Sequence, residues 1–222
     1  MGAEILSQLK QNMRKAFETC IKCYDAVFNF FFYLPCGGET SFRERCVKFA
    51  TIKAGDRILD LCCGTGDLMT AISRQGTAVQ LVGIDVSDSA IEIARRKTRF
   101  VPVTLLRASA DDLPLNSSQF DKCFISFGLH HMSRYERQKT LAEVHRTLTP
   151  KGNLYIIDYN LPERGLKRLV SIFLIKLDKS KEASKMLKSG SLVREIKHAG
   201  FEIKQQVLTC HGITKIIEVV KK

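Results

Sequence analysis

The sequence predicts an α/β protein whose core is one doubly wound, seven-stranded sheet, mostly parallel with one antiparallel strand. Two observations lead to this prediction. From residue 56 onward, short apolar runs alternate with helical patterns, which is typical of parallel strands joined by crossover helices. Only "TCHG" separates the last two apolar runs, and strands joined by so short a turn must be antiparallel.

Each element follows from its own stretch of sequence. Helices are expected at about 66–75, 88–98 and 135–148, and the last should end at "TPKG", where Pro150 and Gly152 supply a stop signal. Strands are indicated by apolar runs of five to eight residues. They are expected at 57–61, 79–85, 103–108, 120–127, 153–159, 202–208 and 213–220.

A length of 222 residues and a hydrophobic content of 45% suit one well-buried domain rather than two. Around a ligand-binding core at 51–159 we expect an N-terminal helical cap at 1–50 and a helical lid insertion at 160–190. The last helix and a closing hairpin occupy 191–222. The cap and the lid should lie above the carboxyl ends of the strands, where open α/β sheets bind ligands.

The formal net charge is +12, and residues 160–222 hold 14 Lys or Arg against 6 Asp or Glu. A local positive field suits nucleic acid or lipid headgroups, although a solubilising basic face explains the composition equally well. No apolar run is long enough to span a membrane, and the N-terminus lacks a signal-peptide core. We therefore expect a cytoplasmic protein with its eight cysteines reduced, and we leave open a peripheral contact with the inner membrane surface.

The stretch "DLCCGTGD" at 60–67 places a glycine-rich turn between a predicted strand and a predicted helix. A dinucleotide-binding turn would need a glycine at Met69. Asp60 and Asp67 flank the turn, and their carboxylates would repel a pyrophosphate but attract an ammonium or sulfonium group. This charge pattern points to S-adenosylmethionine, which Gly64 and Gly66 would let the backbone approach closely.

Two later pieces fit the same ligand. Asp85 ends the second predicted strand, where its carboxylate can accept both ribose hydroxyls while Val86 packs on adenine. Capping of the helix that starts near Ser87 is the alternative role for Asp85. After the third strand, Ser109, Ala110 and Asp111 of "ASADDLPL" could frame the adenine edge.

With these motifs the sequence resembles the class I S-adenosylmethionine-dependent methyltransferases, and most of all the ubiquinone/menaquinone biosynthesis C-methyltransferase family. The resemblance rests on "YDAVFN", "LDLCCGTGDL", "GIDVS", "ADDLP", "ISFGLHHM", "AGFE" and "LTCHGITKIIEV", which span nearly the whole chain. It implies a Rossmann-like fold, S-adenosylmethionine as cofactor and a small, lipophilic, quinone-like methyl acceptor. The cofactor-binding positions that it implies or that the turn predicts are Asp60, Cys62, Gly64, Thr65, Gly66, Asp85, Val86, Ser109, Ala110, Asp111 and Ser126.

Several positions depart from that family. Cys62 stands where many methyltransferases carry a glycine, and Ser109 stands where Asp or Asn is usual. "FGLHHM" replaces the family's Arg-Asn after "FGL". These differences leave other acceptors open, namely a phospholipid amine, an arsenical or another small molecule. A nucleic-acid-binding protein or RNA methyltransferase is the alternative from another class, and we do not expect it because "ISFGLHH" stands where a base-methylation motif would be.

Candidate catalytic residues follow from position. His130 and His131 come after the fourth strand at the ligand edge, and an unperturbed histidine suits a general base. Tyr159, at the tip of the fifth strand, and Tyr24 are further candidates. Packing or local hydrogen bonding is the structural alternative for each, because alignment alone can support methyl transfer. Metal binding is not expected, since the one short-spaced cysteine pair of the N-terminal segment lacks partners for a tetrahedral site.

The segment 164–177 combines a dense apolar stripe with Lys167, Arg168 and Lys176. This composition is typical of a helix that lies in a membrane interface, and a lid with solvated basic residues explains it equally well. The aromatic cluster at 28–33 fits an apolar lid of its own. The sequence does not indicate an oligomeric state.

Overall fold

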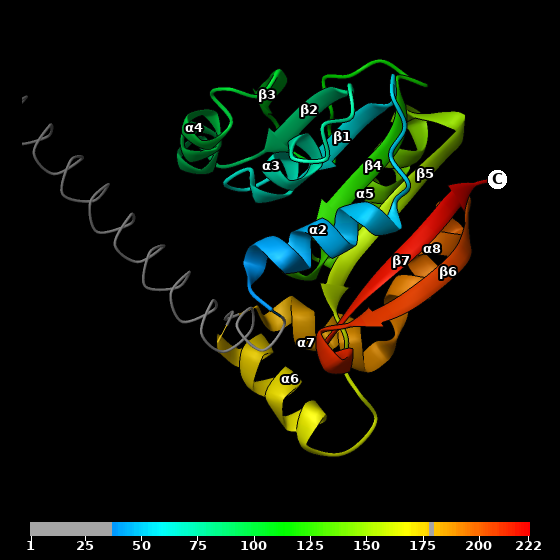
Figure 1. The fold of residues 1–222 in the computed structure, drawn as a ribbon. Helices are drawn as coiled ribbons and strands as arrows, with labels where there is room; N and C mark the ends of the chain where they lie inside the picture. The colour runs from blue at the N-terminus through cyan, green and yellow to red at the C-terminus, as the bar shows by residue number, and fades with distance from the viewer. Residues whose placement is uncertain (1–36, 178–179) are drawn as a thin grey trace, which may run out of the picture. The chain divides into compact units, whose positions relative to one another are not determined.

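The computed structural model describes residues 37–177 and 180–222 (Figure 1). The chain divides into two compact units, residues 1–42 and 43–222, and the sheet lies in the second. Tyr24 and the aromatic cluster at 28–33 lie outside the described residues. The expectations placed on them, and the single-domain boundaries drawn from the sequence, therefore stay predictions.

Seven strands form one sheet in the order β3-β2-β1-β4-β5-β7-β6. Neighbouring strands from β3 to β5 are parallel, and β7 runs antiparallel to both β5 and β6. The predicted fold class, with one reversed strand near the edge, is confirmed. The strands are β1 Arg57–Leu61, β2 Gln80–Asp85, β3 Val103–Arg107, β4 Phe120–Ser126, β5 Leu148–Tyr159, β6 Phe201–Thr209 and β7 Thr214–Lys221.

Helices connect the strands and cover the sheet, with α2 in front of it and α8 behind it in Figure 1. Local sequence explains where two of them start. The Ser87 hydroxyl caps α4, and Ser133 forms a capping box with Glu136 at the start of α5. The helices are α2 Glu39–Phe49, α3 Asp67–Ser73, α4 Asp88–Lys97, α5 Arg134–Thr147, α6 Leu166–Leu177, α7 Lys181–Ser189 and α8 Ser191–His198, with short 3₁₀ turns η3 Leu129–His131 and η4 Cys210–Gly212.

The boundary between α5 and β5 differs from the prediction. We expected the fifth strand to begin at 153 after a "TPKG" turn, but β5 begins at Leu148, directly after α5. Phe120 pairs with Leu148, and the register then shifts before Lys122 pairs with Asn153. The extra residues of β5, which include Pro150, lie between these two pairs and form a bulge. A bulge is a position in a sheet that tolerates proline.

The core lies on both faces of the sheet because its parallel strands are covered by helices. Leu59, Ile125 and Ile156 are fully buried in the central strands. On one face α5 and α8 are joined by an ion pair with two hydrogen bonds, from Arg137 Nε and Nη2 to the carboxylate of Glu195 at 2.7 and 3.0 Å. Both side chains are buried, so this pair fixes the two helices against each other.

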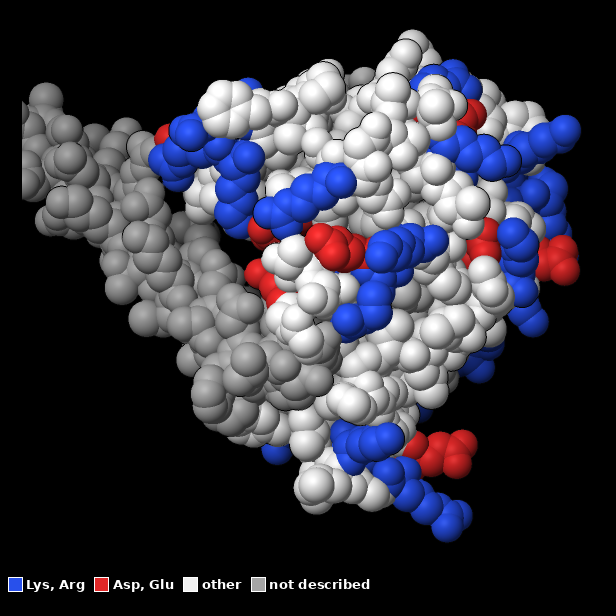
Figure 2. Space-filling view, in the orientation of Figure 1, with Lys and Arg blue, Asp and Glu red and all other residues white. Residues whose placement is uncertain are grey.

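Two helices, α6 and α7, occupy the predicted lid insertion at 160–190. On α6 the apolar residues Leu166, Leu169 and Phe173 are 75%, 64% and 51% exposed. Figure 2 shows Lys and Arg side chains at the bottom of the view, around the end where α6 begins. In the described part of the chain, no helix is both long and apolar enough to cross a membrane.

The state of the cysteines agrees with the sequence-based expectation only in part. Cys46, Cys62, Cys63 and Cys123 are free thiols. Cys210 is disulfide-bonded, so the expectation that every cysteine is reduced is wrong at this position.

Candidate active site

The carboxyl ends of four neighbouring strands bring the main polar side chains to one edge of the sheet. Asp60 belongs to β1, Asp85 ends β2, Ser126 ends β4 and Asp158 lies near the end of β5. These strands are adjacent in the order β2-β1-β4-β5. Residues up to 98 positions apart in the sequence therefore meet where open α/β sheets bind ligands.

The glycine turn after β1 depends on left-handed backbone at Cys62, Gly64 and Gly66, whose φ angles are 60°, 52° and 85°. A Cβ atom on Gly64 would meet nothing within 4 Å, so this residue borders open space. A Cβ on Gly66 would lie 3.2 Å from the Cβ of Ala94 on α4. Gly64 thus leaves room for a ligand, whereas Gly66 serves the packing of α4, a role that the sequence did not indicate.

The carboxylate of Asp85 holds the turn in place. It accepts hydrogen bonds from the backbone N–H groups of Gly64 and Ser87, both at 2.9 Å. The N-cap of α4 is the side chain of Ser87, which accepts from the N–H of Ala90, so Asp85 does not serve as the helix cap. Each Asp85 oxygen keeps a further lone pair that can accept a ligand hydroxyl.

Asp60 lies beneath the turn and is 1% exposed. Neither of its carboxylate oxygens has a hydrogen-bond partner in the structure. Burial raises its pKa to about 7, and the positive charge of Arg43 opposes that rise. A buried carboxylate without hydrogen bonds is costly, and a cationic or N–H-bearing ligand group would satisfy it.

Asp67, the other carboxylate beside the turn, is already neutralised. Burial alone would raise its pKa, but hydrogen bonds from Lys97 and Thr65 outweigh this effect and lower it. Lys97 Nζ lies 2.8 Å from one Asp67 oxygen, and the Thr65 hydroxyl donates to the other at 2.7 Å. The sequence suggested that both carboxylates would attract a cation, and the geometry leaves this role to Asp60.

Val86 and the loop with Ser109 and Asp111 follow the neighbouring strands β2 and β3. Val86 is 64% exposed, and the neighbouring strand β3 ends at Arg107, whose Nε donates to the Val86 carbonyl at 3.2 Å. Ser109 donates its hydroxyl to the carboxylate of Asp111, and Ala110 between them is half-buried. This arrangement offers one apolar face and one polar edge, which suits a planar base.

The sequence reasoning missed Arg43 of α2. Its guanidinium donates to the hydroxyl of Ser126 at the end of β4 and lies 5.6 Å from the ring centroid of Phe127. It also acts electrostatically on Asp60. Nothing in the local pattern "SFRER" distinguishes this arginine from a surface residue, so only the fold reveals its place.

The histidine pair after β4 divides into a buried and an exposed residue. His130 is fully buried, and its Nδ1 lies 2.7 Å from Oδ1 of Asp158. The ring of Tyr159, also fully buried, lies 4.8 Å from the His130 ring, and Ser180 donates to the His130 carbonyl at 2.7 Å. His131 is exposed. Of the two, His130 is the buried residue, and the carboxylate of Asp158 orients its ring.

One more charged residue faces this pair. Lys215 of β7 stands opposite Asp158 in the sheet register. Burial lowers the pKa of Lys215, while the charge of Asp158 opposes that effect. Among residues 37–177 and 180–222, no group of three His, Cys, Asp or Glu side chains could hold a metal ion.

Residues 58–152 match a family model described as a methyltransferase domain. A demethylmenaquinone methyltransferase from Thermus thermophilus is 37% identical over 139 residues, which are 62% of each protein. A 2-phytyl-1,4-naphtoquinone methyltransferase from Nostoc sp. is 30% identical over 159 residues, 69% of this chain and 67% of that protein. A solved S-adenosylmethionine-dependent methyltransferase from Aquifex aeolicus shares the fold, with a TM-score of 0.69 and 21% identity over 92% of this chain and 98% of that one. The match to the Thermus thermophilus protein thus covers less than two thirds of that protein's length.

Proposed function

We propose a methyl-transfer reaction for this chain, which belongs to the family of S-adenosylmethionine-dependent methyltransferases. The acceptor in this proposal is a small, lipophilic, quinone-like ring in its reduced form. The observation that carries the proposal is the buried carboxylate of Asp60, whose two oxygens have no hydrogen-bond partner in the structure, directly below a glycine turn that borders open space at Gly64.

The residues at this edge fit S-adenosylmethionine by their chemistry. Asp60 would satisfy its carboxylate with the cationic amino-acid part, and Asp85 has free lone pairs for the ribose hydroxyls. The exposed Val86 would cover one face of the adenine, with Asp111 at its edge. The guanidinium of Arg43, close enough to act on Asp60, would pair with the cofactor carboxylate. When bound, the cofactor supplies a methyl group activated by a sulfonium.

The protein's part in the reaction is to align the acceptor, exclude water and remove a proton. In this proposal His130 donates Nδ1–H to Asp158, whose Oδ1 lies 2.7 Å away, and Nε2 of the neutral ring accepts the proton. When a ring carbon of the acceptor gains a methyl group, the proton that it loses would pass to this nitrogen. His131 is exposed and Tyr159 is buried against His130, so we assign the base to His130; Tyr24 stays a prediction.

The choice of acceptor draws on relatives. The similar proteins from Thermus thermophilus and Nostoc sp. are named for demethylmenaquinone and for 2-phytyl-1,4-naphtoquinone. Both names describe a flat ring that carries an apolar tail. A phenolic ring of this kind gains from a base such as His130, whereas an amine or a thiol acceptor has a lone pair of its own.

Peripheral contact with the inner, anionic membrane surface is part of the proposal, because an acceptor with an apolar tail is stored in the bilayer. The exposed residues Leu166, Leu169 and Phe173 of α6 would enter the interface, with the exposed Lys167 and Lys176 toward the headgroups. Arg168, which the sequence placed in this set, is half-buried and donates to the carbonyl of Pro162 at 2.9 Å. It holds the start of α6 instead.

A turnover assay with a water-soluble 1,4-naphthohydroquinone tests the proposal. The natural chain should methylate this acceptor on carbon, and His130→Gln should lower kcat by about 100-fold, the usual size of a general-base effect, with little change in cofactor affinity. His131→Gln is the matched control and should retain activity within about threefold, because His131 is exposed rather than buried beside Asp158. Cofactor binding without any turnover would exclude this acceptor class, and no cofactor binding at all would exclude the function.

A further inference from the structure

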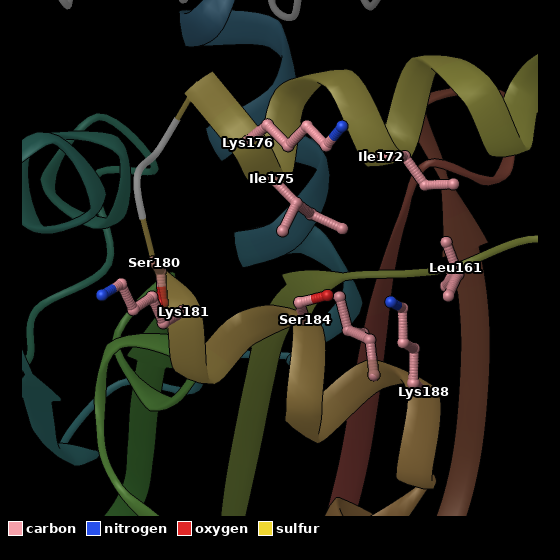
Figure 3. Close-up of a pocket in the computed structure, with 9 residues that line it drawn as sticks. Leu161, Ile172, Ile175, Lys176, Ser180, Lys181, Ser184 and Lys188 are labelled. Carbon is pink, nitrogen blue, oxygen red and sulfur yellow. The ribbon is translucent and has the colours of Figure 1, made fainter.

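A cavity of about 320 Å³ lies between α6 and α7, away from the glycine turn. In Figure 3, Ile172 and Ile175 point from α6 into the space between the helices, and Ser184 and Lys188 point into it from α7. Lys181 turns its ammonium group away from this space. The residues that line the cavity are Leu161, Ile172, Ile175, Lys176, Ser180, Lys181, Ser184, Leu187 and Lys188.

The lining combines two kinds of chemistry. Lys188 and Ser184 bring an ammonium group and a hydroxyl into the space, and Lys176 lies along α6 at its edge (Figure 3). The Ser180 hydroxyl already donates to the His130 carbonyl, and four aliphatic side chains form the rest of the lining. No carboxylate belongs to the described lining. Glu182, the acidic residue of α7, is bound instead by Lys185 at 2.6 Å. An occupant that matches these walls is an anion joined to an apolar chain.

We propose that this cavity binds the phosphate headgroup of an anionic phospholipid at the membrane surface. The inference deepens the proposed membrane contact and rests on it. Lys176, Lys188 and the hydroxyl of Ser184 would hold the phosphate, while the first carbons of the acyl chains would lie on Ile172 and Ile175.

The position of the cavity on α6 favours a membrane lipid over free phosphate. Leu166, Leu169, Phe173 and Lys176 recur every three or four residues, so they lie on one side of the helix. Lys176 also lines the cavity. The exposed apolar stripe and the cavity therefore adjoin at Lys176, and a phospholipid whose headgroup entered the cavity would have its tails directed along the stripe. Free phosphate would leave the aliphatic walls uncovered.

The cavity also touches the candidate active site. Ser180, at the start of α7, lines the cavity, and its hydroxyl donates to the backbone carbonyl of His130 at 2.7 Å. A bound headgroup would therefore contact the same short segment that fixes the proposed base.

Calorimetry on the full chain with short-chain phospholipids below their micelle concentration tests the inference. Dihexanoyl-phosphatidylglycerol should bind, while dihexanoyl-phosphatidylcholine and inorganic phosphate should each bind at least about tenfold more weakly, because one lacks the net charge and the other lacks the chains. Equal binding of phosphate would mean a simple anion site, and equal binding of the choline lipid would mean an apolar groove. Either result overturns the proposal.

A double variant and a control variant test whether the lipid binds in this cavity. Lys176→Gln together with Lys188→Gln should weaken phosphatidylglycerol binding about tenfold, consistent with the loss of two charge-assisted contacts. Lys185→Gln removes a charge from the same helix outside the cavity and should change it by less than about twofold. A comparable loss in the control would show that only overall charge matters and would overturn the site.

Cofactor affinity, measured on the same samples, separates the two proposals. All three lysines are exposed, so the variants should fold and bind S-adenosylmethionine like the natural chain. Lipid binding without cofactor binding would remove the methyl-transfer function and leave the headgroup site. Cofactor binding with no phosphatidylglycerol binding would remove the headgroup site alone.

Discussion

Asp60 links protonation to folding at the scale of a single residue. Its burial raises the pKa of the folded state to about 7, while an aspartate in an unfolded chain has a pKa of about 3.9. Between these values the folded protein keeps a proton that the unfolded chain has released. The contribution of Asp60 to stability is therefore greatest at low pH and is lost as the pH rises toward 7.

The Asp60→Asn variant should remove this pH dependence. Urea unfolding of the natural chain measures the free energy of unfolding at each pH. Asp60 should contribute a fall of on the order of 2 kcal/mol in this free energy between pH 5 and pH 8. The Asn side chain does not titrate, so the variant's profile should lack that component. Parallel profiles for the two proteins would mean that Asp60 keeps an ordinary pKa in the fold.

We expect Asp85 both to bind the cofactor and to hold the glycine turn in its conformation. Asp85→Ala removes the acceptor of the Gly64 and Ser87 N–H groups and the proposed ribose contact. Cofactor affinity should fall by about 1.5 kcal/mol or more, roughly tenfold, as for a lost charge-assisted hydrogen bond. Calorimetry measures this loss. Asp121→Ala, which removes a carboxylate paired with Arg57 at the start of β1 and β4, is the control and should bind normally.

At the residue scale the sequence indicated the groups that belong to local motifs. Asp60, Gly64 and Asp85 were predicted because a turn and a strand end mark them within a few positions. Arg43 was not, because its partner Ser126 is 83 positions away. Long-range pairs leave no trace in a single sequence.

At the scale of elements, the buried pair Arg137 and Glu195 controls how α5 and α8 pack. Glu195→Ala should lower the free energy of unfolding by about 3 kcal/mol or more, because it leaves a buried guanidinium without its carboxylate. Urea unfolding measures the loss. Glu182→Ala removes the partner of the exposed Lys185 and should cost less than about 1 kcal/mol. Similar losses in the two variants would show that burial adds nothing to the α5–α8 pair.

The element boundaries show what periodicity can and cannot predict. β1 and the starts of α4 and α5 were predicted within one residue, because an apolar run marks the strand and a helical pattern marks each helix. The start of β5 was predicted five residues late. Its first residues, "LTPKG", have the composition of a turn, and they join the sheet because Phe120 of β4 offers a partner at Leu148. Pairing with a neighbour overrode local propensity there.

At the scale of the whole molecule, ligand binding should stabilise the fold. S-adenosylmethionine at about 100 times its dissociation constant should raise the free energy of unfolding by about 2.7 kcal/mol. Gly64→Val puts a branched side chain into the open space beside the turn and should gain nothing from the cofactor while it still unfolds cooperatively. Thermal melting with and without cofactor measures both. Equal stabilisation of the two proteins would show that the turn is not part of the binding site.

The position of β7 determines when the sheet can be completed during translation. β7 follows β6 in the sequence but lies between β5 and β6 in the sheet. While the ribosome is making β6, one edge of β5 has no partner, and β6 has nowhere to attach. An open strand edge can pair with other nascent chains. The sheet can close only when residues 214–221 have left the ribosome exit tunnel and insert between two strands that were made before them.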